Sequence, residues 1–335
     1  MTHPHVTIRD VAARAGVSHQ TVSRVINGRE RVNPDTKARV EAAIAELGYQ
    51  PSAIARSMAI GRSGILACIS PNLTDYTFAS IIDGAERGAR ERGYFLMSAS
   101  AHDAETFAAL VEQLVPSRQV EGLMVINPYA DGRFQHLPPN FPTVFAGARP
   151  REEGANSVSL DDVAVGQAAA AHLLRLGHRR IGLVTGIMSE DCSQDRMAGY
   201  EAALQTAGLP LEPDLIIEGN WQAHSGYDAL MQFAQSGALP DAIFAQNDQM
   251  AVGALRAASD LGVNVPAQLS VIGVDDIPLA AYFDPPLTTL RQDFAHIGQE
   301  AARLLIQAIE QPTAPRQHVR LPAAFIARRS TGPVV

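Results

Sequence analysis

The sequence predicts an α/β protein with a small N-terminal helix-turn-helix headpiece and a larger core of two doubly wound parallel-sheet lobes. Two short amphipathic helices fit residues 8–27, and apolar runs alternate with helical stretches beyond residue 64. A chain of 335 residues has room for about two domains at the usual ~100–200 residues each. Its hydrophobic fraction of 46% is typical of a globular protein with a sizeable core.

The first predicted element is the helix pair within residues 8–27. Gly16 favours a tight turn between the helices, and Ser18 is placed to cap the second. The apolar contacts between the helices are expected from Val11, Ala12, Ala15, Val17, Val22 and Val25. The polar side chains that point away from this contact are His19, Gln20, Thr21, Ser23 and Arg24. Such a second helix, rich in side chains that can read bases, indicates a helix-turn-helix that binds duplex DNA.

Charge is unevenly distributed along the chain. The formal net charge of −8 argues by itself against a DNA-binding protein. Residues 1–62, however, hold nine Lys and Arg against five Asp and Glu, whereas residues 63–335 hold 18 against 30. The positive charge therefore lies in the part that contains the helix-turn-helix, as expected where a protein meets the phosphate backbone.

A third helix and a linker follow the helix pair. Asn33 is a favourable N-cap and Pro34 suits the first helical position, so residues 1–49 are expected to form a three-helix headpiece. Residues 50–63 read as a linker with room for a two-turn helix. Because a helix this short is marginal alone in water, we expect it to form only when another surface covers its apolar side.

Residues 64–335 alternate predicted strands and helices. Strands are expected over residues 65–70, 94–99, 122–126, 143–146, 180–185, 242–245 and 269–274. Helices are expected over residues 78–92, 106–116, 162–176, 194–207, 225–235, 249–261 and 294–310. Nearly continuous apolar strands separated by helices are typical of parallel sheets covered on both faces. Since single cores stop growing near ~250–300 residues, this region is expected to split into two lobes.

Cysteine usage and hydropathy point to the cytoplasm. Cys68 and Cys192 are far apart in sequence, which predicts reduced thiols in a reducing cytosol. His3 and His5 could bind a metal, but a frayed terminus is the simpler interpretation, so no metal site is predicted. The chain opens without the apolar segment of a secretory signal and lacks a run of ~20 uncharged apolar residues. We therefore expect a cytoplasmic protein with no membrane partner.

Several motifs resemble those of the lactose-repressor (LacI/GalR) family. They lie at residues 7–27, 40–51, 246–254, 274–276 and 286–294, and the likeness extends over essentially the whole chain. The resemblance implies a bacterial, nucleoid-associated, homodimeric repressor whose core is similar to periplasmic sugar-binding proteins. The lobes expected from it comprise about 64–160 plus 292–320 and about 161–291 plus 321–332.

The resemblance also implies roles for headpiece and linker residues. His19, Gln20 and Arg24 match the family's major-groove readers, and a bidentate Gln–adenine or Arg–guanine pair is worth ~1–3 kcal/mol of discrimination. The residues expected to cap helices or contact phosphates are Thr7, Ser18, Thr21, Ser23 and Asn27. In the linker, Met58 takes the place of the family's usual leucine wedge in the minor groove, unless it packs on the core. Ala53 would lie near the groove floor.

An effector site is expected in the cleft between the lobes, at the carboxyl ends of the strands. Hydrogen-bonding side chains lie there beside Trp221, the only tryptophan, a mixture that suits a sugar ring. Together with the family's effector contacts, the expected residues are Ser70, Asp75, Phe78, Arg196, Trp221, Asn247, Asp275 and Gln292. Two simpler interpretations remain open: Asn247 caps the following helix, and Trp221 fills the core. Gly147 lies near an acidic sugar contact of the lactose-binding relative, so a galactoside is not implied.

We therefore predict a repressor that binds a palindromic operator and is controlled by a small carbohydrate, an inducer being favoured over a corepressor. Alternatives are a repressor that responds to a nucleobase or nucleoside and, more remotely, a solute-binding protein. Adjacent carboxylates such as Asp275 and Asp276 could suggest glycoside hydrolysis, but sequence neighbours usually point apart and no catalytic motif occurs. No enzymatic activity and no cofactor are predicted. The lack of the family's leucine-heptad tail predicts a dimer, with residues 78–92 in its interface.

Overall fold

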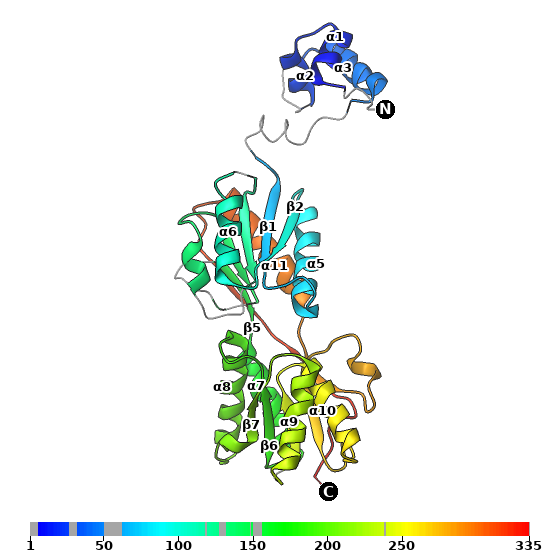
Figure 1. Cartoon of the computed structure of the whole chain (residues 1–335). Helices are drawn as coiled ribbons and strands as arrows, with labels where there is room; N and C mark the ends of the chain where they lie inside the picture. The colour runs from blue at the N-terminus through cyan, green and yellow to red at the C-terminus, as the bar shows by residue number, and fades with distance from the viewer. Residues whose placement is uncertain are drawn as a thin grey trace. The chain divides into compact units, whose positions relative to one another are not determined.

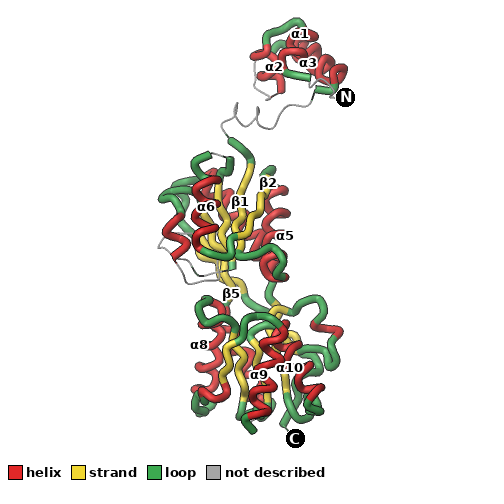
Figure 2. Tube along the Cα trace, in the orientation of Figure 1, coloured by secondary structure: helices red, strands yellow, loops and turns green. Residues whose placement is uncertain are grey.

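The computed structural model describes residues 6–26, 32–49, 62–117, 119–126, 132–147, 149, 156–237 and 239–334. The chain divides into two compact units, Met1–Gly64 and Ile65–Val335. Figures 1 and 2 show the helices of the first unit and the two sheets of the second.

The first unit contains three short helices around a small apolar core. The helices are α1 (Ile8–Ala15), α2 (His19–Ile26) and α3 (Pro34–Leu47). Gly16 ends α1 with a φ of 65°, a left-handed conformation that glycine adopts without a steric penalty. The Ser18 hydroxyl accepts a hydrogen bond from the Thr21 amide, and the Asn33 side chain accepts one from the Asp35 amide. Both predicted N-caps are therefore confirmed.

One buried residue from each helix meets at the centre of this unit. Val11, Val22 and Val40 are fully buried, and Tyr49 closes the core after α3. The predicted DNA contact Asn27 and the predicted hinge, with Ala53 and Met58, lie outside the described residues.

The first sheet of the second unit has six parallel strands in the order β11-β5-β4-β3-β1-β2. Its strands are β1 (Ile65–Ser70), β2 (Phe95–Ser100), β3 (Gly122–Ile126), β4 (Thr143–Ala146), β5 (Asn156–Leu160) and β11 (His318–Leu321). Helices α5 (Tyr76–Arg90) and α11 (Phe294–Glu310) cover one face, and α6 (Ala104–Leu114) covers the other, where the short helix η1 (Gly132–His136) lies beside it.

The second sheet has the order β12-β10-β9-β8-β6-β7. Its strands are β6 (Ile181–Thr185), β7 (Ile216–Glu218), β8 (Ala242–Ala245), β9 (Ser270–Asp275), β10 (Thr288–Arg291) and β12 (Ala324–Ile326). One face packs on α7 (Asp162–Arg175) and α8 (Asp191–Thr206), the other on α9 (Ala223–Gln235) and α10 (Asp248–Asp260). The short helices η2 (Pro213–Leu215) and η3 (Ala280–Tyr282) lie in connecting segments.

The prediction of two parallel-sheet lobes is confirmed, and the second sheet has one antiparallel strand at its edge. Strand β12 pairs antiparallel with β10, because the chain returns to the second sheet directly from β11 without a crossover helix. Strands β5, β7, β10, β11 and β12 were not predicted. Several helices begin earlier than predicted, since Asp75 caps α5 and Asp103 caps α6.

Three helix pairs of the second unit cross at glycines. Helices α5 and α11 pack closely at Gly84 and Gly298, and helices α9 and α10 pack closely at Gly226 and Gly253. In the pair α7–α8, a Cβ atom on Gly166 would lie 1.9 Å from the carbonyl oxygen of Arg196. These backbones approach too closely for any side chain, which fixes the crossing point of each pair.

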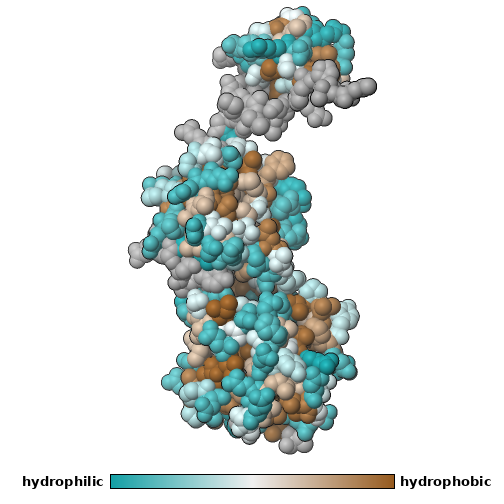
Figure 3. Space-filling view, viewed as in Figure 1, coloured by the Kyte–Doolittle hydropathy of each residue, from teal (hydrophilic) through white to brown (hydrophobic). Residues whose placement is uncertain are grey.

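Figure 3 shows one face of the surface. On the second unit, hydrophobic residues lie there in small groups among hydrophilic ones. Among the described residues, none of the helices combines the length and apolarity that a membrane span requires.

Candidate functional site

The second helix of the first unit displays the predicted base-reading residues. His19, Gln20 and Arg24 are exposed on α2, while Val22 points into the core. The Ser18 and Thr21 hydroxyls lie 2.9 Å apart and form the N-cap of this helix. At the start of α1, the backbone N–H and the hydroxyl of Thr7 both donate to the Asp10 carboxylate at 2.7 Å. Capping thus fixes the start of each helix, and His19, Gln20 and Arg24 remain exposed along α2.

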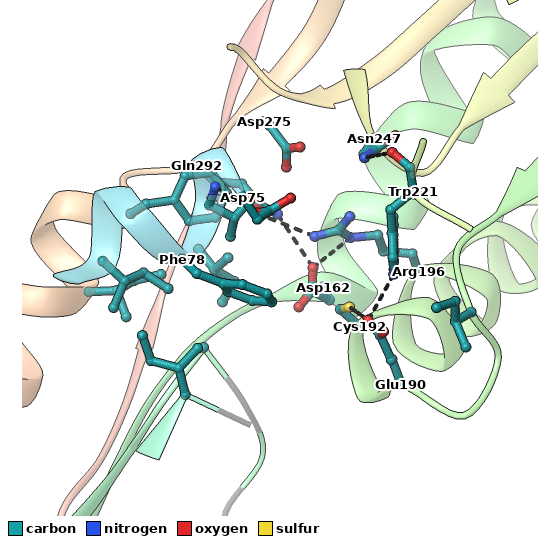
Figure 4. Close-up of a pocket in the computed structure, with 18 of the residues that line it drawn as sticks. Asp75, Phe78, Asp162, Glu190, Cys192, Arg196, Trp221, Asn247, Asp275 and Gln292 are labelled. Atoms are coloured by element: carbon teal, nitrogen blue, oxygen red, sulfur yellow. Dashed lines mark hydrogen bonds and ion pairs between the residues drawn. The ribbon is translucent and has the colours of Figure 1, made fainter. Parts of the chain in front are cut away.

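The second unit contains a cavity of about 240 Å³ between its two sheets, which we call the effector cavity. Residues from the first sheet's side include Asp75, Phe78 and Phe294, and residues from the second include Arg196 and Trp221. Figure 4 shows Asp75, Phe78, Arg196 and Trp221 converging from loops and helices that belong to different elements. Half-polar lining of this kind suits a small ligand with both hydrogen-bonding groups and an apolar face.

Seven of the eight predicted effector residues line the cavity, and Ser70 is the exception. Its side chain is 1% exposed, and its hydroxyl donates to the backbone oxygen of Asn72 at 2.6 Å. The hydroxyl fixes the turn after β1, and Asn72 of that turn lines the cavity, so an effector contact by Ser70 stays a prediction.

Arg196 is the centre of the buried polar network. Its Nε donates to Asp162 Oδ1 at 2.7 Å, and its Nη1 donates to the carbonyl of Gln246. Gln292 bridges the same pair, since its Oε1 lies 3.4 Å from Arg196 Nη2 and its Nε2 lies 3.4 Å from Asp162 Oδ1. The Arg196 side chain is only 6% exposed, so its position is fixed by these protein contacts before any ligand arrives.

Asn247 and Trp221 combine structural and cavity-facing roles. Asn247 caps α10, its Oδ1 accepting from the Met250 amide, and its Nδ2 donates to the Trp221 carbonyl at 2.9 Å. Trp221 has a φ of 70°, and its ring lies where a side chain at Gly186 would be, because a Cβ there would meet the indole at 1.9 Å. Both simpler interpretations are therefore partly right, and both residues still line the cavity.

Asp275 and Asp276 point in different directions. Asp276 accepts from Arg291 Nε and Arg328 Nη2, each at 2.6 Å, and is a structural ion-pair partner. Asp275 ends β9, is 7% exposed and lines the cavity, and its carboxylate accepts no hydrogen bond from the described part of the chain. Burial raises the pKa of Asp275 well above its ordinary value, although the charge of Arg196 opposes the shift.

Two carboxylates of this cavity were not recognised as site residues from sequence. These two are Asp162 and Glu190. Glu190 precedes α8, is 4% exposed, and accepts a hydrogen bond from Trp221 Nε1 at 2.9 Å. Burial raises the pKa of Glu190 to about 7, against the stabilising hydrogen bond from Trp221. The sequence feature that could have identified Glu190 is its position after β6, at the sheet edge where the other strand-end residues lie.

This pKa gives a stability prediction for Glu190→Gln. The folded state holds the proton up to about pH 7, whereas the ordinary pKa is 4.5, so wild-type stability falls as pH rises between these values. The amide carries no charge, and the variant should gain roughly 2–3 kcal/mol relative to wild type at pH 8 compared with pH 4. Urea unfolding at both pH values measures this. Glu212→Gln, at an exposed glutamate, should show no such difference; equal behaviour of both variants would contradict the prediction.

Comparison with known proteins identifies both units. The model of bacterial regulatory proteins of the lacI family matches residues 7–52, and a periplasmic binding protein-like domain matches residues 170–331. The ribose operon repressor of Escherichia coli (strain K12) is 34% identical over 328 residues, covering 97% of this chain and 99% of the relative. The repressor PurR of Serratia proteamaculans (strain 568) is 34% identical over 336 residues, covering 98% of each.

Solved structures agree with this assignment. The lac repressor dimer bound to operator and the anti-inducer ONPF matches with a TM-score of 0.89 and 31% identity, covering 98% of this chain and all of that one. The complex of the transcriptional regulator CelR with cellobiose matches with a TM-score of 0.74 and 30% identity, covering 97% and 99%.

A helix-turn-helix unit followed by a two-sheet binding core defines the class of DNA-binding regulators with a ligand-binding domain. The chain belongs to the LacI family of bacterial regulatory proteins. It is a DNA-binding transcriptional repressor rather than an enzyme.

Proposed function

We propose that this repressor binds a palindromic operator as a homodimer and releases it when a small carbohydrate fills the effector cavity. The observation that carries the proposal is the combination of Arg196, Asn247 and Asp275 with the ring of Trp221 in one cavity. Hydrogen-bonding groups of both kinds match ring hydroxyls, and an indole face matches the C–H face of a sugar. The ribose operon repressor and the CelR–cellobiose complex support the same class of ligand.

A purine is the second candidate, because PurR is as similar to this chain as the ribose operon repressor. A thermal-shift screen of the full-length protein against sugars, nucleosides and nucleobases separates the two. A ligand at about 100 times its Kd adds ~2.7 kcal/mol to the stability of the folded state and raises the unfolding midpoint. Stabilisation by purines alone would overturn the carbohydrate proposal. An operator titration with the stabilising ligand then gives the sign of the control.

Exposed apolar side chains on the second unit support a dimer. Phe95 and Met97 on the edge strand β2 are 76% and 39% exposed, and Tyr282 is 84% exposed. Aromatic residues and methionine are enriched in protein–protein interfaces relative to the rest of the surface. Helix α5, named in the expected interface, contacts β2 directly.

We propose that Arg24 reads one base pair of each half-site. Arg24→Ala should cost ~1–3 kcal/mol of operator affinity and relax the sequence preference at one position only. Binding assays on a set of single-base operator variants measure this. Arg39→Ala, which removes an exposed charge from α3, should lower affinity equally for all sequences. A uniform loss in the Arg24 variant would remove its proposed role in base reading.

Asp275 and Asp276 should respond in opposite ways to the same substitution. Asp275→Asn replaces a buried carboxylate without hydrogen-bond partners in the described chain, so stability at pH 8 should not fall while the response to effector is lost. Asp276→Asn leaves Arg328 and Arg291 without their anion and should lower stability by about 1–3 kcal/mol. Thermal unfolding and effector-induced release from the operator measure both effects. Similar profiles for the two variants would show that Asp275 has no special role.

A further inference from the structure

Acidic residues outnumber basic residues in the described lining of the effector cavity. Among the described lining residues, the carboxylates are Asp75, Asp162, Glu190 and Asp275, and the only cationic side chain is Arg196. The guanidinium of Arg196 is already paired with Asp162 and also donates to the backbone and to Gln292. One carboxylate is thus neutralised by the protein, and three surround the remaining space.

These three carboxylates retain acceptor capacity toward the cavity. Asp75 caps α5 with its Oδ1, which accepts from the Thr77 amide at 2.9 Å. Glu190 uses its Oε2 for Trp221 Nε1 and, more weakly, for Cys192 Sγ at 3.9 Å. Asp275 is more than nine-tenths buried, and within the described chain no donor reaches its carboxylate. An unpartnered buried carboxylate is costly, and a ligand that donates hydrogen bonds or brings positive charge recovers that cost.

The three groups also act on one another. The negative charge of Asp75 raises the pKa of both Glu190 and Asp275, which places all three within electrostatic range. Cys192 adds no anion, because burial raises the pKa of its thiol. An anionic ligand, such as a sugar phosphate, would add a further negative charge to this space. A neutral sugar brings no charge that would stabilise the ionised forms of Glu190 and Asp275, whereas an ammonium group does.

We propose that the effector is a polyhydroxylated amine of the amino-sugar class, and that Glu190 selects its ammonium group. This inference rests on the proposed carbohydrate function and narrows it. The hydroxyls would bind Arg196, Asn247 and Asp275, as for any sugar. Glu190 lies beside the indole of Trp221 and would pair with the amine through the oxygen that Trp221 does not use.

The test compares matched ligands on the full-length protein. Glucosamine, galactosamine and mannosamine are each titrated against the parent hexose, the N-acetyl derivative and the 6-phosphate of the amine, by calorimetry and thermal shift at pH 7.5. We expect at least one amine to bind ten times more tightly than its three counterparts. Binding should also release protons, detected in buffers of different ionisation enthalpy, because an ammonium beside Glu190 favours its ionised form.

Glu190→Gln removes the charge and keeps an oxygen that can accept from Trp221. The preference for the amine should fall below threefold in this variant and stay unchanged in Glu212→Gln, whose glutamate is exposed and distant in sequence. A hexose or a phosphate that binds as tightly as its amine, an unchanged preference in Glu190→Gln, or failure of all the amines to bind would overturn the inference. In the first two cases the carbohydrate proposal still stands. Binding of purines alone would overturn the carbohydrate proposal itself.

Discussion

Replacing Arg196 with methionine is expected to lower the free energy of unfolding of the second unit by about 3–5 kcal/mol. The substitution leaves Asp162, which is 9% exposed, as a buried carboxylate whose one remaining side-chain hydrogen bond within the described residues comes from Gln292 at 3.4 Å. It also removes the hydrogen bond to the Gln246 carbonyl, next to the cap of α10. Denaturant unfolding followed by circular dichroism measures the loss, and the response to effector should disappear with it.

Arg149→Met is the matched control. Arg149 pairs with Asp195 on the same helix as Arg196, but the arginine side chain is 44% exposed. Exposed pairs of this kind contribute ~0–1 kcal/mol, so the control should be nearly neutral. The double variant Asp162→Asn with Arg196→Met should be more stable than Arg196→Met alone, because the unpaired charge is gone. A double variant no more stable than the single one would show that the pair is not what makes Arg196 important.

The strands that were predicted correctly are those buried on both faces. Strands β1, β3, β4 and β8 are continuous apolar runs, and the structure gives each the predicted bounds. Strand β11 alternates between exposed and half-buried residues at the edge of its sheet, and β12 is three residues long. Which segment forms an edge strand depends on the tertiary fold. Short polar edge strands are therefore difficult to predict from their own residues.

The site was predictable where a polar residue directly follows an apolar strand. Asp275 ends β9 and Asn247 lies two residues beyond β8, which made both visible from sequence. Glu190 lies five residues beyond β6, and its burial depends on the indole of Trp221 from another loop. Ser70 satisfies the same strand-end rule, but its hydroxyl donates to the Asn72 carbonyl and the residue does not line the cavity. The rule finds the correct edge of the sheet, but local hydrogen bonds decide which side chains face the cavity.

The glycines at the helix crossings were invisible to pattern analysis, because nothing in a helical periodicity marks a residue whose missing Cβ matters. These glycines are required because the backbone of the neighbouring helix lies close to them, and only the folded structure shows this contact. Gly199 on α8 illustrates this, since a Cβ there would meet the Val163 carbonyl oxygen of α7 at 2.0 Å.

Gly166→Ala should therefore destabilise the second unit by about 3 kcal/mol, near the upper end of overpacking effects. In an unconstrained helix interior the same change stabilises by roughly 0.5–1 kcal/mol, so the expected sign is reversed. The new methyl would lie 1.9 Å from the Arg196 carbonyl oxygen, and the clash is with backbone, so α7 and α8 must separate. Separation moves Asp162, the first residue of α7, away from Arg196, and effector affinity should fall together with stability.

Gly88→Ala provides the comparison on α5. The nearest atom to its added methyl would be the Cα of Gln299 at 3.2 Å, a contact that small shifts relieve, so its effect should stay within about 1 kcal/mol of zero. Urea unfolding of both variants gives the difference, and ligand titration tests whether it reaches the cavity. Equal destabilisation by the two substitutions would mean that the α7–α8 crossing tolerates a side chain. A loss of stability in Gly166→Ala with unchanged effector affinity would mean that the Arg196–Asp162 pair is positioned independently of that crossing.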